Sequence, residues 1–348
     1  MILEDAGVLP LITTQNLERM LSEPSEGLVR FIAKLDGDIT ILGAGGKMGP
    51  SLAHLLRRTI DAAGVRKRVI AVSRFSNHET ATWLRSVGVK VVSVDLLDWR
   101  RMASLPHTAN VIDLLGQKFG TTGNEPQTWM MNTYLAGKVA ETFKDSRIVF
   151  YSTGNVYPLV PVESGGATEE QAPAPVGEYA QSRLGGERIL EYFSREWGTR
   201  LTIMRLNYAA ELRYGVIHDV AKMIVDRKPI DLTMGYVNVI WQRDANEAGV
   251  RSLGLASSPP FMINVTGEET VSVRRMAERL GELLGIQPIF TGQEQGTSLL
   301  SNAGAAEKLF DFPRVKVDQV MRWVADWISS GGASLGKPTH YQEREGLF

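Results

Sequence analysis

From residue 38 onward, short runs rich in β-branched residues alternate with helical segments, and this alternation restricts the fold more than any other feature of the chain. We expect strands at 38–43, 68–73, 89–95, 110–115, 147–153 and 200–206. Helices are expected between them at 48–63, 81–88, 126–144 and 178–197. Strands that alternate with helices form a parallel sheet covered by helices on both faces. The sequence therefore predicts an α/β fold with a Rossmann-like, doubly wound parallel sheet.

The rest of the chain divides around this sheet. We expect four parts: an N-terminal helical extension at 1–36, a Rossmann dinucleotide-binding domain at 37–206, a small α/β substrate-binding cap interleaved with the end of the sheet at 207–330, and a C-terminal tail at 331–348. The extension carries one amphipathic helix within 24–37, and the cap carries two, at 272–285 and 316–330. The Gly- and Ser-rich tail is interpreted as a loose or partner-docked end.

Composition excludes several classes of function. With no cysteine among 348 residues, there is no disulfide, cysteine-ligated metal or thiol nucleophile. The five histidines are scattered, so we expect no metal site. A net charge of −1 argues against nucleic-acid binding. No stretch approaches the ~20 apolar residues of a membrane span, and the start lacks the basic residues of a secretory signal. We therefore expect a cytoplasmic protein without a membrane partner.

A glycine-rich turn joins the first strand to the first helix. Gly43, Gly46 and Gly49 are spaced three residues apart, and Lys47 and Met48 lie between the last two. Backbone without side chains can approach a pyrophosphate closely, and the helix that follows offers free N–H groups and the positive end of its dipole. In this strand–turn–helix setting, the motif predicts dinucleotide binding by these five residues.

The ends of the next strands suggest which dinucleotide binds. An acid after the second strand accepts hydrogen bonds from the 2′-hydroxyl of NAD, whereas a base suits the 2′-phosphate of NADP. Here Ser73 is followed by Arg74 and no acid, so the cofactor is NAD(P), with NADP slightly favoured. Asp95 either contacts the adenine or caps a helix. We also expect three residues at the carboxyl end of the fourth strand to line the cofactor site: Leu114, Leu115 and Gly116.

Two further segments complete a pattern. The first is FYSTGNVYP at 150–158, and the second is EYAQSRLGGE at 178–187. Together with the glycine turn, they resemble the extended short-chain dehydrogenase/reductases, the NAD-dependent sugar epimerase/dehydratase family. The resemblance covers about residues 38–330 and includes Asn132, the R-x-x-N-like segment 205–208, the V-x-D-x-A-like segment 241–245 and the strand–helix unit 261–285.

The resemblance implies a nicotinamide held over the sheet, with Asn132 in the cofactor site. It implies that Tyr179 is the acid/base for a substrate hydroxyl or carbonyl. Thr153 takes the position of the hydroxyl that bonds the reacting oxygen, and Ser152 precedes it. The family also packs as a homodimer through two helices, here the one around 132–143 and the one that carries Tyr179.

One position departs from the family. The sequence reads YAQSR where the family has YxxxK, so Arg183 replaces the lysine that binds the nicotinamide ribose. Arginine keeps the positive charge one helical turn from Tyr179, but it is effectively never deprotonated. Three interpretations stay open. Tyr179 works with Arg183 as its partner; another residue, such as Lys118, carries the proton; or the domain binds nucleotide without redox chemistry, as a sensor or structural subunit.

The substrate site is less constrained by the sequence. Candidate substrate contacts are Ser152, Thr153, Lys118, Asn207, Arg213 and His218, of which the last two suit a carboxylate or phosphate. The family's N-x-Y-G-P is altered to NYAAEL, so a smaller sugar, a sugar acid or a polyol is as plausible as a nucleotide sugar. The sequence predicts an NAD(P)-dependent oxidoreductase or epimerase/dehydratase acting on a carbohydrate-like hydroxyl. The alternative is a catalytically reduced NAD(P)-binding subunit.

Overall fold

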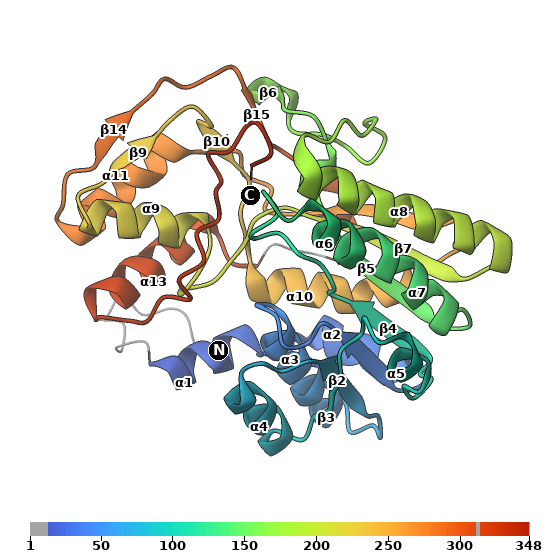
Figure 1. Ribbon diagram of the computed structural model, residues 1–348. Coiled ribbons are helices and arrows are strands. Elements are labelled where there is room, and N and C mark those ends of the chain that lie inside the picture. Colours follow the sequence, from blue (N-terminus) through green and yellow to red (C-terminus); the bar gives the residue numbers. More distant parts are fainter. Residues whose placement is uncertain (1–12, 311–313, 348) are drawn as a thin grey trace.

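The computed structural model describes residues 13–310 and 314–347 of the chain. Its centre is a seven-stranded parallel sheet with the strand order β12-β7-β5-β4-β1-β2-β3 (Figure 1). The strands are β1 (Ile39–Leu42), β2 (Val69–Ser73), β3 (Lys90–Ser93), β4 (Asn110–Asp113), β5 (Arg147–Thr153), β7 (Arg200–Leu206) and β12 (Phe261–Val265). This confirms the predicted fold class. The strand order reverses between β1 and β4, and in such sheets ligands bind at that point, beyond the carboxyl ends of the strands.

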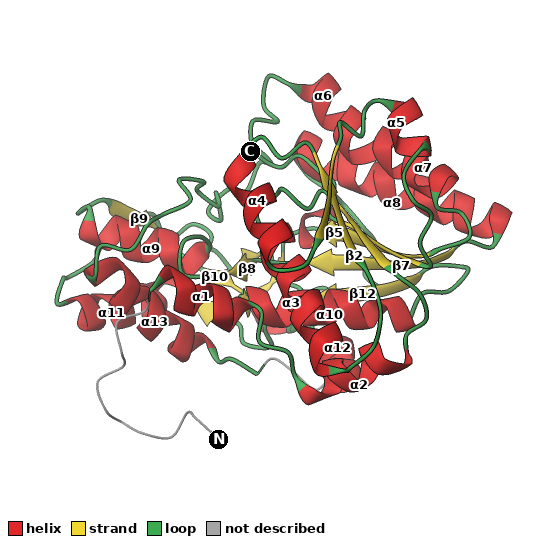
Figure 2. Cartoon of the chain, turned by 90° about the horizontal axis from the view of Figure 1, so that it is seen from below, coloured by secondary structure: helices red, strands yellow, loops and turns green. Residues whose placement is uncertain are grey.

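Helices cover both faces of the sheet because alternate residues of each strand point to opposite sides. Ile39 and Ile41 of β1 belong to the cluster shared with α2, α3 and α10, whereas Leu42 belongs to the cluster shared with α7 and α8. Figure 2 shows the sheet between these two helical layers. The helices around the sheet are α2 (Glu26–Lys34), α3 (Gly49–Ala62), α4 (His78–Ser86), α5 (Trp99–Ala103), α6 (Glu125–Trp129), α7 (Leu135–Thr142), α8 (Gly177–Trp197), α10 (Gln242–Arg251) and α12 (Gly304–Phe310).

The cap has a hydrophobic cluster of its own. It contains α9 (Val216–Val225), α11 (Val273–Leu284) and α13 (Val317–Ser329). Three two-stranded sheets join it: β8 (Ala209–Ala210) with β11 (Ile240–Trp241), β9 (Pro229–Asp231) with β14 (Ile289–Thr291), and β10 (Tyr236–Val237) with β13 (Val271–Ser272). A fourth pair is β6 (Val160–Pro161) with β15 (Thr297–Ser298), and short 3₁₀ turns η2 (Gly154–Val156), η3 (Val162–Ser164) and η4 (Ser252–Gly254) complete the structure.

Three differences from the sequence predictions concern the core and the surroundings of the site. A helix that was not predicted, α1 (Thr14–Leu21), inserts Leu17 and Leu21 into the cap cluster. The single helix expected at 126–144 is interrupted by a π-helical turn, η1 (Met130–Tyr134), between α6 and α7. The sequence also missed α10, because this helix is buried yet largely polar and lacks an amphipathic pattern. Its Arg243 pairs with Asp244 at 2.9 Å.

The C-terminal tail is not loose, as far as the structure describes it. Residues 331–347, here called the strap, run from α13 across the junction of the cap and the sheet domain (Figure 1). The Leu335 N–H donates to the Arg213 carbonyl at 3.0 Å, and the Tyr341 side chain is buried in the cap cluster. The prediction of a loose end was wrong because these contacts join segments far apart in the sequence. None of the helices in the described part of the chain has the length and apolar character that a bilayer crossing requires.

Candidate active site

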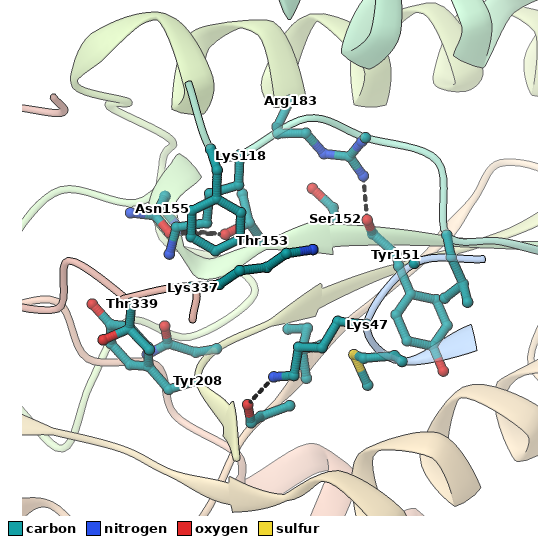
Figure 3. A pocket seen from close by; sticks show the side chains of 18 of the residues that line it. Lys47, Lys118, Tyr151, Ser152, Thr153, Asn155, Arg183, Tyr208, Lys337 and Thr339 are labelled. Atoms are coloured by element: carbon teal, nitrogen blue, oxygen red, sulfur yellow. Dashed lines mark hydrogen bonds between the residues drawn. The ribbon is translucent and has the colours of Figure 1, made fainter. Parts of the chain in front are cut away.

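A cavity of about 340 Å³ lies at the carboxyl ends of the central strands, between the sheet and the cap. Its floor is the glycine turn and the segments that follow β4 and β5. Its cap side is formed by residues 207–209 and 214–216, and the strap contributes Lys337 and Thr339. Figure 3 shows the labelled side chains gathered around this cavity.

The glycine turn is packed so tightly that side chains would not fit. Gly43 has φ +76, and a Cβ there would come within 3.0 Å of the Leu114 backbone. At Gly49, a Cβ would clash with the Ala44 backbone. The turn leads directly into the N-terminus of α3, and Gly43, Gly46 and Gly49 all line the cavity. Bare backbone at a helix N-terminus is a binding site for a pyrophosphate, so these residues fit the dinucleotide that the motif predicts.

A second hollow of about 390 Å³ adjoins the first beyond β2 and β3. Both hollows share Leu114, Leu115 and Gly116. Residues Ser73 to Asn77 line the second hollow and include no acid, whereas Arg74 is exposed there. Asp95 also lines it, and its Oδ1 accepts a hydrogen bond from the Leu97 N–H at 3.0 Å. This bond closes a turn, and the N-cap of the helix that follows, α5, is Asp98, so Asp95 does not cap that helix.

The expected proton-transfer group and its neighbours lie on two adjacent elements. Tyr179 is in the first turn of α8, Thr153 is the last residue of β5, and both line the cavity. The Thr153 hydroxyl donates to Asn155 Oδ1 at 2.9 Å. The Ser152 hydroxyl instead donates to Glu187, whose carboxylate also pairs with Arg205 at 2.7 Å in the protein interior. The Ser152 hydroxyl therefore belongs to this buried network, whereas the Thr153 hydroxyl does not.

Arg183 lies one helical turn below Tyr179 and is almost fully buried. Its guanidinium donates to the Tyr151 carbonyl (Figure 3) and to the Leu115 carbonyl at 2.8 Å. It also stacks over the Phe150 ring at 4.3 Å. Burial lowers the pKa of Arg183 from its ordinary value. The side chain thus joins the ends of β4 and β5, and its hydrogen bonds to backbone hold it in place.

Two lysines bring further positive charge to the cavity. The Lys47 Nζ donates to the Ala209 carbonyl at 2.7 Å and lies 3.4 Å from the centre of the Tyr214 ring. Burial lowers the pKa of Lys47 to about 7. The Lys118 Nζ lies 5.9 Å from the Tyr179 ring centre, and burial lowers the pKa of Lys118 to about 8. No Asp or Glu of the described residues lines this cavity, so its charge is positive.

Asn132 acts from behind the cavity wall. It sits in the π-helical turn, where its Oδ1 accepts from the Gln117 N–H at 2.7 Å. Its Nδ2 donates to the Gln117 carbonyl at 3.0 Å and to Ser182 Oγ at 2.9 Å. Asn132 therefore fixes the loop that carries Gly116 and Lys118 and does not itself line the cavity.

Two of the expected substrate residues do not reach the cavity. Arg213 pairs with Glu18 at 3.0 Å and with Glu211 at 3.1 Å. The His218 ring lies 2.8 Å from the Leu212 carbonyl oxygen and 3.0 Å from Ser334 Oγ. Both side chains hold the cap, the N-terminal helix and the strap together. Asn207 and Lys118, by contrast, do line the cavity.

Sequence reasoning did not identify several residues of the cavity wall. Tyr208 is the last residue of the R-x-x-N-like segment 205–208, and Tyr214 lies in the altered segment that follows it; the position of this segment is what could have indicated both. No sequence pattern indicated that Lys337 and Thr339 line the cavity, because they lie in a tail without helical or strand periodicity. Within the described ranges, no group of three or more metal-ligating side chains could hold a metal ion.

Comparison with known proteins agrees with the family resemblance seen in the sequence. A family model described as "NAD dependent epimerase/dehydratase family" matches residues 39–232. No curated protein sequence matches the chain. Among solved structures, similar ones are MoeE5 in complex with UDP-glucose and NAD (TM-score 0.69, 17% identity, 84% of this chain and 99% of that chain covered) and the UDP-Glc/GlcNAc 4-epimerase from Campylobacter jejuni (0.69, 19%, 84% and 99%). A third is the UDP-glucuronic acid 4-epimerase from Bacillus cereus in complex with NAD (0.67, 16%, 84% and 96%).

Proposed function

The chain belongs to the NAD dependent epimerase/dehydratase family of enzymes, and from this membership we propose that it oxidises a hydroxyl of a carbohydrate-like substrate. The observation that carries the proposal is the convergence of Tyr179, Thr153 and the glycine turn on one cavity. An acid/base, a hydroxyl beside it and a dinucleotide cradle are what such a reaction requires.

The proposed chemistry uses few groups. The nicotinamide, when bound, accepts a hydride and can return it. The Tyr179 phenolate takes the proton of the substrate hydroxyl as the carbon that bears it loses the hydride, so that a carbonyl forms. The Thr153 hydroxyl bonds the oxygen that changes from hydroxyl to carbonyl. The positive charges of Arg183 and Lys118 lie near Tyr179 and stabilise the negatively charged phenolate form of its side chain.

We propose that the cofactor is NAD(P), with a preference for NADP. The support is Arg74, exposed in the hollow beyond β2, and the lack of an acid among residues 73–77. Arginine pairs bidentately with phosphate, and no carboxylate is present at this strand end for a 2′-hydroxyl. MoeE5 and the Bacillus cereus epimerase are described with NAD, so NAD is the competing choice.

The preference can be tested directly. Identification of the dinucleotide released when the purified protein is denatured shows which one it retains. We expect Arg74→Ala to weaken NADP binding at least tenfold and to change NAD binding little, as measured by calorimetry. An equal loss of affinity for NADP and NAD in Arg74→Ala, or no loss of affinity for either, would contradict the preference for NADP.

The substrate, we propose, carries an anionic group. Lys47 and Lys118 face a cavity that no described carboxylate lines, and four tyrosines border it: Tyr151, Tyr179, Tyr208 and Tyr214. A sugar acid, a sugar phosphate or the diphosphate of a nucleotide sugar would balance this charge. UDP-sugars are the first compounds to test, because the similar structures are named with them.

The reaction itself is tested with Tyr179→Phe. Candidate sugars are screened with cofactor-loaded protein for cofactor reduction and for isomerised product. We expect Tyr179→Phe to lower kcat by about 10²–10⁴-fold, the usual contribution of a positioned acid/base, while cofactor affinity stays within twofold. Wild-type turnover in this variant would exclude Tyr179 as the acid/base. Tight cofactor binding with no turnover across the panel would favour the sensor or structural subunit.

We also propose a homodimer formed through α7 and α8. Exposed aromatic side chains gather on this helical layer, with Tyr134, Tyr192 and Trp197 each about half exposed. A shallow hollow between the two helices is lined by Gly137, Ile189 and Phe193. An apolar patch of this kind is typical of a subunit interface, and the family forms dimers through the same two helices.

A further inference from the structure

The strap is fastened on both sides of one short segment. Before it, the Leu335 N–H donates to the Arg213 carbonyl. After it, the Thr339 N–H and hydroxyl both donate to Asp219 Oδ2, at 2.7 and 2.6 Å. Only Gly336, Lys337 and Pro338 lie between these anchors. Because Pro338 restricts its own backbone and that of the residue before it, the structure holds Lys337 at a fixed place over the cavity.

The rest of the strap is also bound to the body of the protein. Tyr341 is 1% exposed. The Arg344 guanidinium donates to the Thr297 carbonyl at 2.9 Å and to its hydroxyl at 2.7 Å. Gly346 packs against Gly177 at the start of α8, so closely that no side chain would fit at Gly177. The strap thus extends from the cap to the sheet domain and passes over the site between them.

Lys337 lies opposite the glycine turn. Besides the two hollows described above, a third of about 520 Å³ lies between α1, α4 and the turn, and all three meet at the same point. Gly46 and Lys337 are the two residues that line all three. Figure 3 shows the Lys337 side chain extending into the cavity together with that of Lys47.

In the first cavity, the Lys337 side chain lies near other cations, and no Asp or Glu of the described residues lines that cavity; Glu18 and Glu79 line the third hollow and Asp95 lines the second. No ion pair within the described ranges involves Lys337. Burial is the main cause that lowers the pKa of Lys47; the charges of Glu211 and Asp219 oppose this shift, and those of Lys118 and Lys337 add to it. Cations gathered in this way repel one another until an anion binds between them.

We propose that Lys337 binds the pyrophosphate of the dinucleotide cofactor from the side opposite the glycine turn, and that the strap must lift before the cofactor can leave. The backbone N–H groups of the turn and the α3 terminus contact the anion from one side, and the ammonium contacts it from the other. The strap then slows cofactor release, so the protein retains its dinucleotide between turnovers. This inference rests on the cofactor of the proposed function and not on its substrate or its reaction.

The first test measures cofactor dissociation. Protein loaded with labelled NAD(H) or NADP(H) is mixed with excess unlabelled cofactor, and release is followed in the wild type, Lys337→Ala, Lys337→Arg and Lys90→Ala. Lys90 is an exposed lysine on the edge strand β3, away from these hollows, and serves as the matched control. We expect Lys337→Ala to dissociate at least tenfold faster and Lys337→Arg to stay close to the wild type, with Lys90→Ala unchanged. A dissociation rate unchanged in Lys337→Ala would overturn the proposal.

A second readout follows the strap itself. Amide hydrogen exchange of residues 332–344 is measured with and without cofactor. We expect cofactor to slow this exchange in the wild type and much less in Lys337→Ala; equal protection in both would overturn the role of Lys337. If the wild type binds neither dinucleotide, the cofactor of the proposed function is wrong and the strap proposal fails with it. Tight binding without these differences overturns the strap proposal alone.

Discussion

We propose that Arg183 and Lys118 together take the role of the single lysine that the resemblance implies beside Tyr179. The guanidinium of Arg183 is hydrogen-bonded to two strand-end carbonyls and stacks on Phe150, so it is held in the wall. Lys118 approaches the rings of both Tyr179 and Tyr208 from the opposite loop. Because burial lowers the pKa of Lys118 to about 8, it changes charge within the pH range in which enzymes are assayed. We infer that Lys118 makes the proposed activity sensitive to pH.

The pH dependence follows from the sign of that charge. Lys118 is a cation below pH 8 and neutral above it, so its support for the Tyr179 phenolate is present at low pH and is lost as the pH rises through about 8. We expect kcat/KM of the cofactor-loaded enzyme to fall above pH 8. In Lys118→Met, kcat/KM at pH 7 should be about 10- to 100-fold lower, without this descending limb. Lys118→Arg should keep activity to higher pH, and a limb near pH 8 that survives in Lys118→Met would refute the assignment.

Tyr151 offers a test of packing that does not depend on the function. Its hydroxyl is buried against Gly249 and has no hydrogen-bond partner within the described residues. A buried polar group without a partner costs about 1–3 kcal/mol. We therefore expect Tyr151→Phe to raise the free energy of unfolding by about 1 kcal/mol in a denaturant titration. The matched control is Tyr157→Phe, which should lower it, because the Tyr157 hydroxyl bonds Asn264 and Arg205 at 2.9 and 2.8 Å. Equal changes in the two variants would contradict this reasoning.

At the level of secondary structure, the elements that the sequence predicted are those whose pattern is local. Six strands of the sheet were recognised as β-branched runs, β12 was recognised within the strand–helix unit 261–285, and most of the large helices were recognised by apolar periodicity. The π-helical turn was not, since it depends on one extra residue in a helix of ordinary composition. Helix α10 was not recognised either, and its buried charged residues Arg243, Asp244 and Glu247 form ion pairs in the folded chain. Arg213 was predicted to contact an anionic group of the substrate because the sequence does not show its ion pair with Glu18, which is 195 residues away along the chain.

The π-helical turn positions the loop beyond β4, and this can be tested through Asn132. Substitution by Leu removes three hydrogen bonds and leaves the partly buried N–H and carbonyl of Gln117 without these partners. We expect Asn132→Leu to lower the free energy of unfolding by about 2–4 kcal/mol and to weaken cofactor binding through Gly116. Thr133→Val, which loses one bond to the Ser182 carbonyl in the same turn, is the control and should cost about 1 kcal/mol. Wild-type stability and affinity in Asn132→Leu would contradict the positioning role.

In the whole molecule, the site is formed where three parts meet. The sheet domain supplies the glycine turn, Thr153 and Tyr179, the cap supplies Tyr208 and Tyr214, and the strap supplies Lys337. Cap and strap are tied to each other by the bonds of Asp219 and His218. A change that loosens one of these parts therefore alters the cavity without touching the groups that react. The helical layer formed by α7 and α8 lies away from these contacts and is free to carry the subunit interface.

The proposed dimer is tested on that layer. Tyr192 is 59% exposed on α8, next to Phe193 at a ring distance of 5.5 Å. A charge buried in an apolar interface without a partner is strongly unfavourable, so we expect Tyr192→Glu to convert the dimer to a monomer of 38.4 kDa in size-exclusion chromatography with light scattering. Trp99→Glu is the control, because Trp99 is 61% exposed on α5, outside this layer; it should remain a dimer. A monomeric wild type would reject the dimer, and a dimeric Tyr192→Glu would place the interface elsewhere.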